Sequence, residues 1–290
     1  MLDSPSVNEK LLSVVIPLTQ MAGRMENLKS WFSGAADLPL AIIIVHDTQD
    51  PYTGIELLEL VKAYEKLDIK VVEGTFNSPG LARNAGLTDS LAPWVAFWDA
   101  DDLPNPLQAL AAIAEASPDT EVIIANYAIN SRQSVTSVEH QNRIKTVAVS
   151  PGLWRMIIKR SILGETKFDS VRMGEDQLFL IDLNLGSRKL SFCDREIYQY
   201  FQGSPMQLTS NQESINEVEK TFILAHDRIK KNPKLRTEFS EIVLLGLLGT
   251  AFLRSNRTSR FVLLLQNVAT ILRVRPKTLF SFAVHARKRG

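Results

Sequence analysis

The stretch Trp94-Val-Ala-Phe-Trp-Asp-Ala-Asp-Asp102 joins a run of apolar residues directly to three carboxylates. Residues 94–98 predict a short buried strand. In open parallel sheets, ligands sit outside the carboxyl ends of the strands, so polar residues that follow a buried strand are the first candidates for a site. The stretch therefore predicts one strand of a sheet and the place where chemistry would occur.

Apolar strands alternate with helices on both sides of this stretch. Thr53 and Glu56 form a capping-box pattern at the start of the second predicted helix. Continuous apolar strands that alternate with helices indicate a mostly parallel sheet, covered on both faces and wound with right-handed crossovers. The predicted fold class is therefore α/β, with a Rossmann-like sheet of the kind that binds nucleotides. The predicted strands span residues 12–16, 41–45, 70–72, 94–98 and 121–126, and the predicted helices 26–32, 53–66, 81–90 and 104–116.

The pattern changes after about residue 130. Short polar and apolar strands are expected within residues 131–149, followed by a helix that carries Leu153 to Lys159 and by another helix after Gly174. From Ser214 onward the pattern is helical throughout. We therefore divide the chain into a domain of residues 1–210 and a helical, basic C-terminal extension of residues 211–290.

The overall composition narrows the class of protein. The 290 residues are 45% hydrophobic, which suffices for one large α/β domain with an appendage. The net charge of +1 argues against nucleic-acid binding, because a surface that tracks phosphates needs a basic excess. The single cysteine cannot form an intrachain disulfide, and no secretory leader pattern begins at Met1. The longest apolar stretch, 242–253, is shorter than the roughly 20 residues of a membrane-spanning helix. The sequence predicts a cytoplasmic protein.

The C-terminal tail differs in charge from the rest of the chain. No acidic residue follows Glu241, whereas the tail from Arg254 to Arg289 contains nine lysines and arginines. Apolar helices with arginines at their ends favour a peripheral anchor on the inner face of the cell membrane, drawn to anionic lipid. The alternative is two helices that pack on the preceding domain or form the contact of a homodimer.

The carboxylates of Asp99, Asp101 and Asp102 would repel one another unless a cation or a row of donors compensates them. Carboxylate oxygens suit Mg²⁺ or Mn²⁺, and Mg²⁺ characteristically binds one or two carboxylates together with substrate phosphates. Such an ion would neutralise a departing diphosphate. The alternative is a solvated turn in which Asp102 caps the helix that begins near Pro104.

Polar residues follow two neighbouring strands as well. Arg83 and Asn84 lie in the first turns of a predicted helix, where free backbone N–H groups and the helix dipole favour an anion such as a diphosphate. The alternative is that Arg83 is an ordinary surface cation. Asp47 follows the second strand and is placed either to accept a hydrogen bond from a nucleotide base or to form a turn with Asp50.

A carboxylate pair also begins the helix after Gly174, at Glu175 and Asp176. One of these carboxylates is a candidate general base, which would take a proton from an acceptor hydroxyl as that oxygen attacks the anomeric carbon of a sugar. The alternative is stabilisation of the helix start, which acidic residues commonly provide.

Five stretches, read in order, resemble the family-2 inverting glycosyltransferases with the GT-A fold. The resemblance covers about residues 11–205 and implies a domain 1–210 with a donor half of about 11–130 and an acceptor half of about 131–210. The stretches are Leu12-Ser-Val-Val-Ile-Pro17, Ile43-Ile-Val-His-Asp47, Gly80-Leu-Ala-Arg-Asn-Ala-Gly86, Val95-Ala-Phe-Trp-Asp-Ala-Asp-Asp102 and Gly174-Glu-Asp176.

The resemblance implies a role for each matching residue. Asp101 would bind the metal, Mn²⁺ or Mg²⁺, and Asp176 would be the catalytic base, with Glu175 beside it. The remaining positions would bind the nucleotide sugar: Asp47 the base, Arg83 the base or diphosphate, Asp99 the ribose or donor sugar, with Pro17 and Asn84 in the same group.

The family resemblance also implies a function. It predicts transfer of a sugar from a nucleotide-diphosphate sugar, with a UDP-sugar as the expected donor, to a glycan or lipid-linked acceptor in cell-surface polysaccharide or glycolipid synthesis. The Gln-x-x-Arg-Trp motif of processive synthases is missing, so one sugar per encounter is expected. His46 and the Leu18-Thr19-Gln20 loop depart from the family pattern. The alternatives are a degenerate protein that only binds nucleotide sugars and a sugar nucleotidyltransferase.

Overall fold

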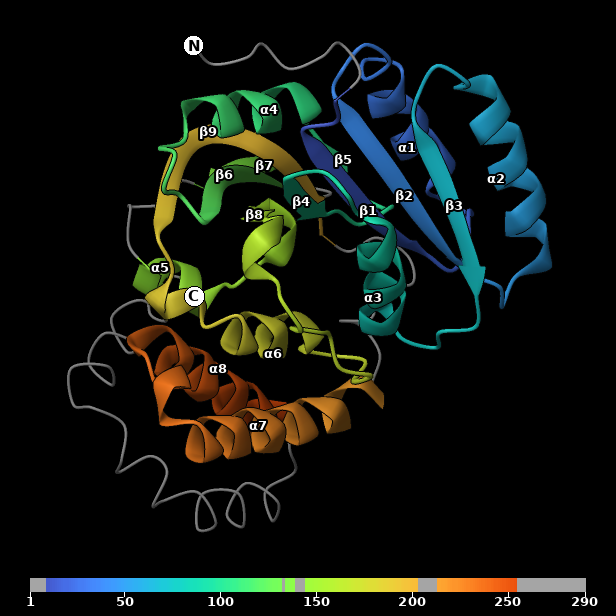
Figure 1. The fold of residues 1–290 in the computed structure, drawn as a ribbon. Helices are drawn as coiled ribbons and strands as arrows, with labels where there is room; N and C mark the ends of the chain where they lie inside the picture. Colours follow the sequence, from blue (N-terminus) through green and yellow to red (C-terminus); the bar gives the residue numbers. More distant parts are fainter. Residues whose placement is uncertain (1–8, 132–133, 139–143, 203–212, 255–290) are drawn as a thin grey trace. The chain divides into compact units, whose positions relative to one another are not determined.

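The computed structural model describes residues 9–131, 134–138, 144–202 and 213–254, which form two compact units (Figure 1). The first unit is drawn from residues 1–139, 153–170 and 189–205, and the second from residues 140–152, 171–188 and 206–290. All the strands described belong to the first unit, whereas the second is built of helices.

Four strands of the first unit form the predicted parallel half of the sheet. They run in the order β3 (Ile69–Gly74), β2 (Leu40–Asp47), β1 (Leu12–Leu18) and β4 (Trp94–Phe97), and neighbouring strands in this row are parallel. Because the four strands are parallel, each of the three connections between them crosses over through a helix. The prediction of a mostly parallel α/β sheet is confirmed here.

The sheet continues with the strand predicted over residues 121–126, with a short strand in the region 131–149, and with three strands that the sequence analysis did not predict. Next to β4 comes β8 (Met156–Lys159), antiparallel to both β4 and β6 (Val122–Asn130). The long strand β9 (Leu190–Phe201) then pairs parallel with β6 and antiparallel with the two-residue strand β5 (Leu103–Pro104). The hairpin strand β7 (Val135–Val138) pairs with β6.

The helix predicted over Leu153–Lys159 is wrong. Leu153–Arg155 form one turn of 3-10 helix and Met156–Lys159 form the buried strand β8. Short apolar runs cannot be assigned to strand or helix by periodicity alone. Here the β-branched pair Ile157 and Ile158 fills a slot between two strands, and both side chains are fully buried.

Helices cover both faces of the parallel strands. Val14, Ile16, Ile42 and Ile44 share a buried cluster with residues of α1 (Met25–Phe32) and α2 (Pro51–Ala63). On the opposite face lies α3 (Pro79–Asp89), where a Cβ at Gly86 would come within 2.5 Å of the Val15 side chain. Glycine is therefore required for α3 to lie this close to β1 and β2.

Two expected helix caps differ from the structure. The N-cap of α2 is Asp50, whose carboxylate accepts the Tyr52 N–H. The predicted cap, Thr53, instead donates its hydroxyl to Asp50 and accepts the backbone N–H of Met21. The helix α4 (Pro106–Glu115) is capped by Asn105 and not by Asp102. In both cases a residue nearer the helix start supplies the oxygen that the first turn needs.

The second unit contains α5 (Ile144–Val149), α6 (Glu175–Asp182), α7 (Glu213–Lys231) and α8 (Glu238–Arg254). Among the described residues of 131–149, β7 matches the strands expected there, whereas α5 is a helix where a strand was expected. α8 packs against α5 and α7, and residues 239–245 of α8 are buried. This described part of the C-terminal extension thus lies within the unit, whereas residues 255–290, which carry most of the basic side chains of the tail, lie outside the described residues.

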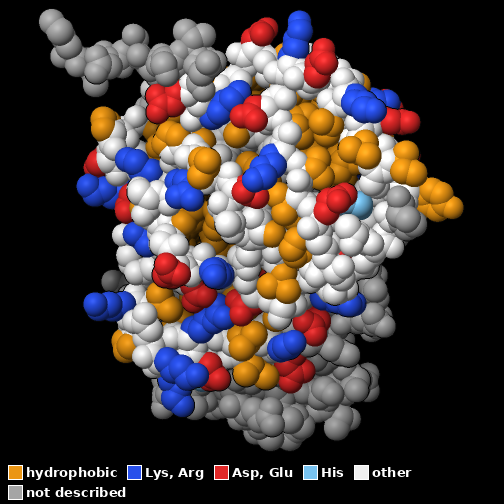
Figure 2. All heavy atoms as spheres, turned by 45° about the vertical axis from the view of Figure 1, so that its right-hand side comes forward, with side chains coloured by type: hydrophobic (Ala, Val, Ile, Leu, Met, Phe, Trp, Pro, Cys, Tyr) orange, Lys and Arg blue, Asp and Glu red, His pale blue; other side chains and the backbone are white. Residues whose placement is uncertain are grey.

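No helix among the described residues is both long enough and apolar enough to cross a membrane. On the face seen in Figure 2, acidic and basic side chains of the described residues are interspersed. Several large apolar side chains are also exposed, among them Tyr52, Ile55 and Leu58 along α2.

Candidate active site

A partly buried ion pair joins the start of α3 to the loop after β4. The Arg83 guanidinium donates a 2.9 Å hydrogen bond to the Asp99 carboxylate. Arg83 is only 8% exposed, and its guanidinium carbon lies 5.7 Å from the centre of the Phe168 ring. The positive charge that the sequence analysis singled out is therefore held in place by a carboxylate and an aromatic ring.

Asp101 lies in the same loop, residues 99–102, which we call the acidic loop. Its backbone carbonyl accepts a 2.7 Å hydrogen bond from the side-chain amide of Asn27 on α1. Burial raises the pKa of the Asp101 carboxyl, the negative charge of Asp99 raises it further, and the positive charge of Arg24 opposes both. Asp101 thus sits where a positive charge would be stabilised.

The third carboxylate of the acidic loop, Asp102, is 2% exposed and faces β9. It accepts hydrogen bonds from the Tyr198 hydroxyl and from the backbone N–H of Phe201, each 2.8 Å long. Burial raises the pKa of Asp102 to about 8, and the charge of Asp99 contributes. Asp102 is therefore neither a helix cap nor a solvated turn residue, as one interpretation of the sequence had it.

This arrangement fits a divalent cation at Asp101. Asp99 is paired with Arg83, and Asp102 is bonded to β9. Within the described residues, no cluster of three or more His, Cys, Asp or Glu side chains could hold a metal by itself. A site that offers one or two carboxylate oxygens suits Mg²⁺ or Mn²⁺ completed by substrate phosphates, and it does not suit an ion that needs an all-protein cage.

Asp47 is 3% exposed and holds the loop between β3 and α3. Its two carboxylate oxygens accept the backbone N–H groups of Phe76 and Asn77, at 3.2 and 2.7 Å. Gln49 donates a further hydrogen bond of 3.3 Å to the same carboxylate. Asp47 thus fixes the loop that leads to Arg83, and its contact with a nucleotide base stays a prediction.

Asn84 also has a structural partner that the sequence did not reveal. Its side-chain amide donates to the Phe168 carbonyl and its side-chain oxygen accepts the Phe168 N–H, both at 2.8 Å. The remaining donor-side residue, Pro17, is half-buried in β1 beside Val45 of β2. For Asn84 and Pro17, contact with a nucleotide sugar stays a prediction.

The predicted base, Asp176, and its neighbour Glu175 begin α6 and belong to the second unit. Asp176 accepts the N–H of Gln177 at 2.7 Å, and Glu175 is 8% exposed. The residue before them, Gly174, has a φ of 84°. The hydroxyl of Thr221 on α7 donates a 2.6 Å hydrogen bond to the Met173 carbonyl, so α7 supports the turn that presents these carboxylates.

Three side chains that organise the site were missed by the sequence analysis: Asn27, Phe168 and Tyr198. Each contacts the acidic loop or Arg83 from a distant part of the chain, Tyr198 across 96 residues. The sequence analysis predicted no strand at Tyr198, which lies in β9. Nothing in a single sequence indicates such long-range partners.

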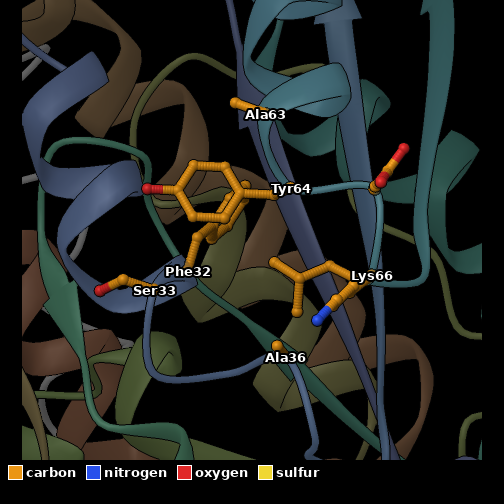
Figure 3. A pocket seen from close by; sticks show the side chains of 8 residues that line it. Phe32, Ser33, Ala36, Ala63, Tyr64 and Lys66 are labelled. Atoms are coloured by element: carbon orange, nitrogen blue, oxygen red, sulfur yellow. The ribbon is translucent and has the colours of Figure 1, made fainter.

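A separate pocket of about 190 Å³ lies at the C-terminal ends of α1 and α2 (Figure 3). Its walls include the rings of Phe32 and Tyr64, and Lys66 lies at one side. None of the predicted site residues lines it.

Comparisons with known proteins identify the family. Residues 13–181 match the profile of glycosyl transferase family 2. The chain is 25% identical over 244 residues to TarP, a poly(ribitol-phosphate) β-N-acetylglucosaminyltransferase of Staphylococcus aureus, and the match covers 78% of this chain and 73% of TarP.

Solved structures show the same fold. The S. aureus TarS fragment 1–349 in complex with UDP-GlcNAc matches with a TM-score of 0.63 and 20% identity, over 95% of this chain and 79% of that one. The mannosyltransferase PcManGT from Pyrobaculum calidifontis, in complex with GDP-Man and Mn²⁺, matches with a TM-score of 0.57 and 14% identity, over 96% and 84%. The predicted GT-A fold is confirmed, and the chain belongs to glycosyl transferase family 2 and is a glycosyltransferase.

Proposed function

We propose that this glycosyltransferase moves a single sugar, with inversion, from a UDP-sugar to a hydroxyl of a cell-surface glycan or lipid-linked glycan, and that it uses Mn²⁺ or Mg²⁺. The observation that carries the proposal is the Arg83–Asp99 pair beside Asp101, at the carboxyl ends of the parallel strands. A fixed cation and a carboxylate that favours a metal are what a nucleotide diphosphate needs in a site.

Each residue would contribute one part of the reaction. Asp101 would hold the metal, which neutralises the charge that develops on the leaving diphosphate. Arg83 would donate to the same diphosphate, while Asp99 keeps its guanidinium oriented and is placed beside the ribose or sugar. These groups fix the donor so that its anomeric carbon is open to attack from one side only.

Asp176 would act as the general base, with Glu175 beside it. It would take the proton of the acceptor hydroxyl as that oxygen bonds to the anomeric carbon, while the bond from that carbon to the diphosphate oxygen breaks. A single in-line displacement of this kind inverts the configuration at the anomeric carbon.

The relatives support the choice of donor and acceptor. TarP carries the name of an enzyme that adds N-acetylglucosamine to poly(ribitol-phosphate), and the TarS fragment was solved with UDP-GlcNAc. PcManGT was solved with Mn²⁺. We extend these properties to the chain as a UDP-sugar donor, a surface polysaccharide acceptor and a divalent metal.

The parts of the chain would divide this work. Residues 11–130 would bind the donor, residues 131–210 would shape the acceptor side, and residues 211–290 would form the helical extension. In this proposal, the basic residues after 254 attach the enzyme to the inner face of the membrane or to a second copy of the chain.

The test is donor turnover by the full chain. UDP- and GDP-sugars are incubated with Mn²⁺ or Mg²⁺, and release of the nucleoside diphosphate is measured, with Asp101→Asn as the site variant. We expect release with at least one donor and a loss of about 100-fold or more in Asp101→Asn, because a metal stabilises the transition state by several kcal/mol.

Asp37→Asn is the matched control, since Asp37 is exposed on the surface. It should keep wild-type turnover. Absence of turnover with every donor would favour a protein that only binds nucleotide sugars, and consumption that requires pyrophosphate would indicate a nucleotidyltransferase.

A further inference from the structure

One phenolic hydroxyl joins both ends of the acidic loop. The Tyr198 hydroxyl accepts the backbone N–H of Asp99 at 3.0 Å and donates to the Asp102 carboxylate at 2.8 Å. The other Asp102 oxygen accepts the Phe201 N–H at 2.8 Å. Three hydrogen bonds therefore fasten the first and last residues of a four-residue loop to one strand, β9.

The backbone on either side of the loop is fixed as well. Before it, the Trp98 N–H donates to the Val15 carbonyl of β1 at 3.1 Å. After it, Leu103 and Pro104 pair with β9, and the Asn105 N–H donates to the Ile197 carbonyl at 2.7 Å. Only the two central residues of the loop, Ala100 and Asp101, lack a bond to Tyr198 or β9, and Asn27 holds the Asp101 carbonyl.

The ring that carries this hydroxyl is itself locked. Tyr198 is 1% exposed and stacks on Trp154, with ring centres 4.8 Å apart and planes 18° apart. Trp154 also stacks on Tyr200 and meets the edge of Tyr127. Because Tyr198 is buried and packed against this aromatic cluster, its side chain and hydroxyl are restricted in position.

We propose that Tyr198 is a positioning residue of the donor site, whose hydroxyl holds the acidic loop so that Asp99 and Asp101 face the nucleotide diphosphate and its metal. Tyr198 touches neither substrate nor metal in this proposal, and it acts through Asp99 and Asp102. The proposal rests on the donor-site roles of Asp99 and Asp101 given under Proposed function.

The chemistry explains why a tyrosine is needed. Its hydroxyl is donor and acceptor at once, so it satisfies a backbone N–H and a carboxylate with one atom. Phenylalanine would keep the stack on Trp154 and leave both of these buried groups without their partner. The loop would then shift to find other partners, and a displacement of about 1 Å in a site can cost on the order of 100-fold in rate.

The test compares Tyr198→Phe with Tyr64→Phe in the full chain. Tyr64 is the matched control, because its hydroxyl donates to the Lys29 carbonyl outside the site. We expect Tyr198→Phe to lower kcat/KM for the donor sugar at least tenfold and to raise the Mn²⁺ concentration for half-maximal activity. The KM for the acceptor should stay within twofold, and Tyr64→Phe should match the wild type.

A smaller loss in kcat/KM than tenfold, or an equal rise in the KM for the acceptor, would overturn the proposal and leave Tyr198 as a structural residue only. If Tyr198→Phe does not fold, Asp102→Asn gives the same decision, because it keeps an acceptor for Phe201 and removes the one that Tyr198 uses. Wild-type chain that turns over no donor would refute the proposed function, whereas active wild type with an unaffected Tyr198→Phe would refute this inference alone.

Discussion

Arg83 on α3 donates a 2.9 Å hydrogen bond to Asp99 in the acidic loop, and the Phe168 ring lies 5.7 Å from its guanidinium carbon. The pair joins α3, which follows β3, to the acidic loop, which follows β4. If Arg83 binds a diphosphate as proposed, this contact with Asp99 would limit the reorganisation that its guanidinium undergoes on binding.

Arg83→Lys should lower kcat/KM for the donor by about 100-fold. Lysine keeps the positive charge but loses the planar guanidinium, which can donate to Asp99 and to a phosphate at the same time. Release of the nucleoside diphosphate measures this. Arg195→Lys is the control, since Arg195 pairs with Glu115 at the surface, and it should stay within about twofold. Equal losses in the two variants would speak against a role for Arg83 in the reaction.

Asn84→Asp should lower the free energy of unfolding by about 1 to 3 kcal/mol, because a carboxylate cannot donate the hydrogen bond that the Phe168 carbonyl accepts from Asn84 and places a negative charge against that oxygen. Urea unfolding followed by tryptophan fluorescence gives the value. The same chemical change at Asn105, the N-cap of α4, should cost less than about 0.5 kcal/mol, since aspartate caps a helix as well as asparagine. Similar costs at the two sites would contradict the bidentate contact.

Stability should fall as the pH rises from about 4 to about 8. The pKa of Asp102 is raised from 3.8 in the unfolded chain to about 8 in the native protein, so in this window the native state binds a proton that the unfolded state does not. The free energy of unfolding therefore declines with pH and levels off above about 8. Asp102→Asn should reduce the dependence of the free energy of unfolding on pH, measured by urea unfolding between about pH 4 and pH 8. If that dependence is unchanged, groups other than Asp102 cause it.

Gly174→Ala should destabilise the protein more than Gly164→Ala. Both glycines have positive φ, 84° and 50°, which an L side chain adopts at a cost of about 1 to 2 kcal/mol. At Gly174 the new Cβ would also lie 2.8 Å from the Thr221 methyl carbon, whereas nothing lies within 4 Å at Gly164. Urea unfolding should show the difference.

Thr221→Ser tests the cause of that difference, because it removes the methyl group and keeps the hydroxyl that bonds Met173. Added to Gly174→Ala, it should reduce the loss to that of Gly164→Ala. No recovery would mean that the strain at Gly174 lies in the backbone alone.

The parallel half of the fold was predictable because its signals are local. Each of β1, β2 and β4 is a largely apolar run with a turn or helix signal beside it, as expected of strands that are buried on both faces. The run from Met156 to Lys159 is also mostly apolar. It forms a strand because it pairs with β4 and β6, and a single sequence does not indicate which strands will pair with such a run.

The candidate site divides in the same way. The positions of Arg83, Asp99 and Asp101 after strands followed from the rule that ligands bind at the carboxyl ends of parallel strands. The bond of Asp102 to Tyr198 and the double contact of Asn84 with Phe168 cross 96 and 84 residues. Such contacts depend on the packed structure, and short-range patterns carry no signal for them.

The place of β8 and β9 in the sheet has a consequence for synthesis of the chain. β4 pairs with β1, which emerges from the ribosome early, and with β8, which emerges some sixty residues after it. The acidic loop is fastened by β9, which ends at Phe201. A nascent chain that stops near residue 150 would expose the open edges of β4 and β6, so chaperone contact and aggregation should peak there, and donor affinity should arise only once residue 201 has cleared the exit tunnel.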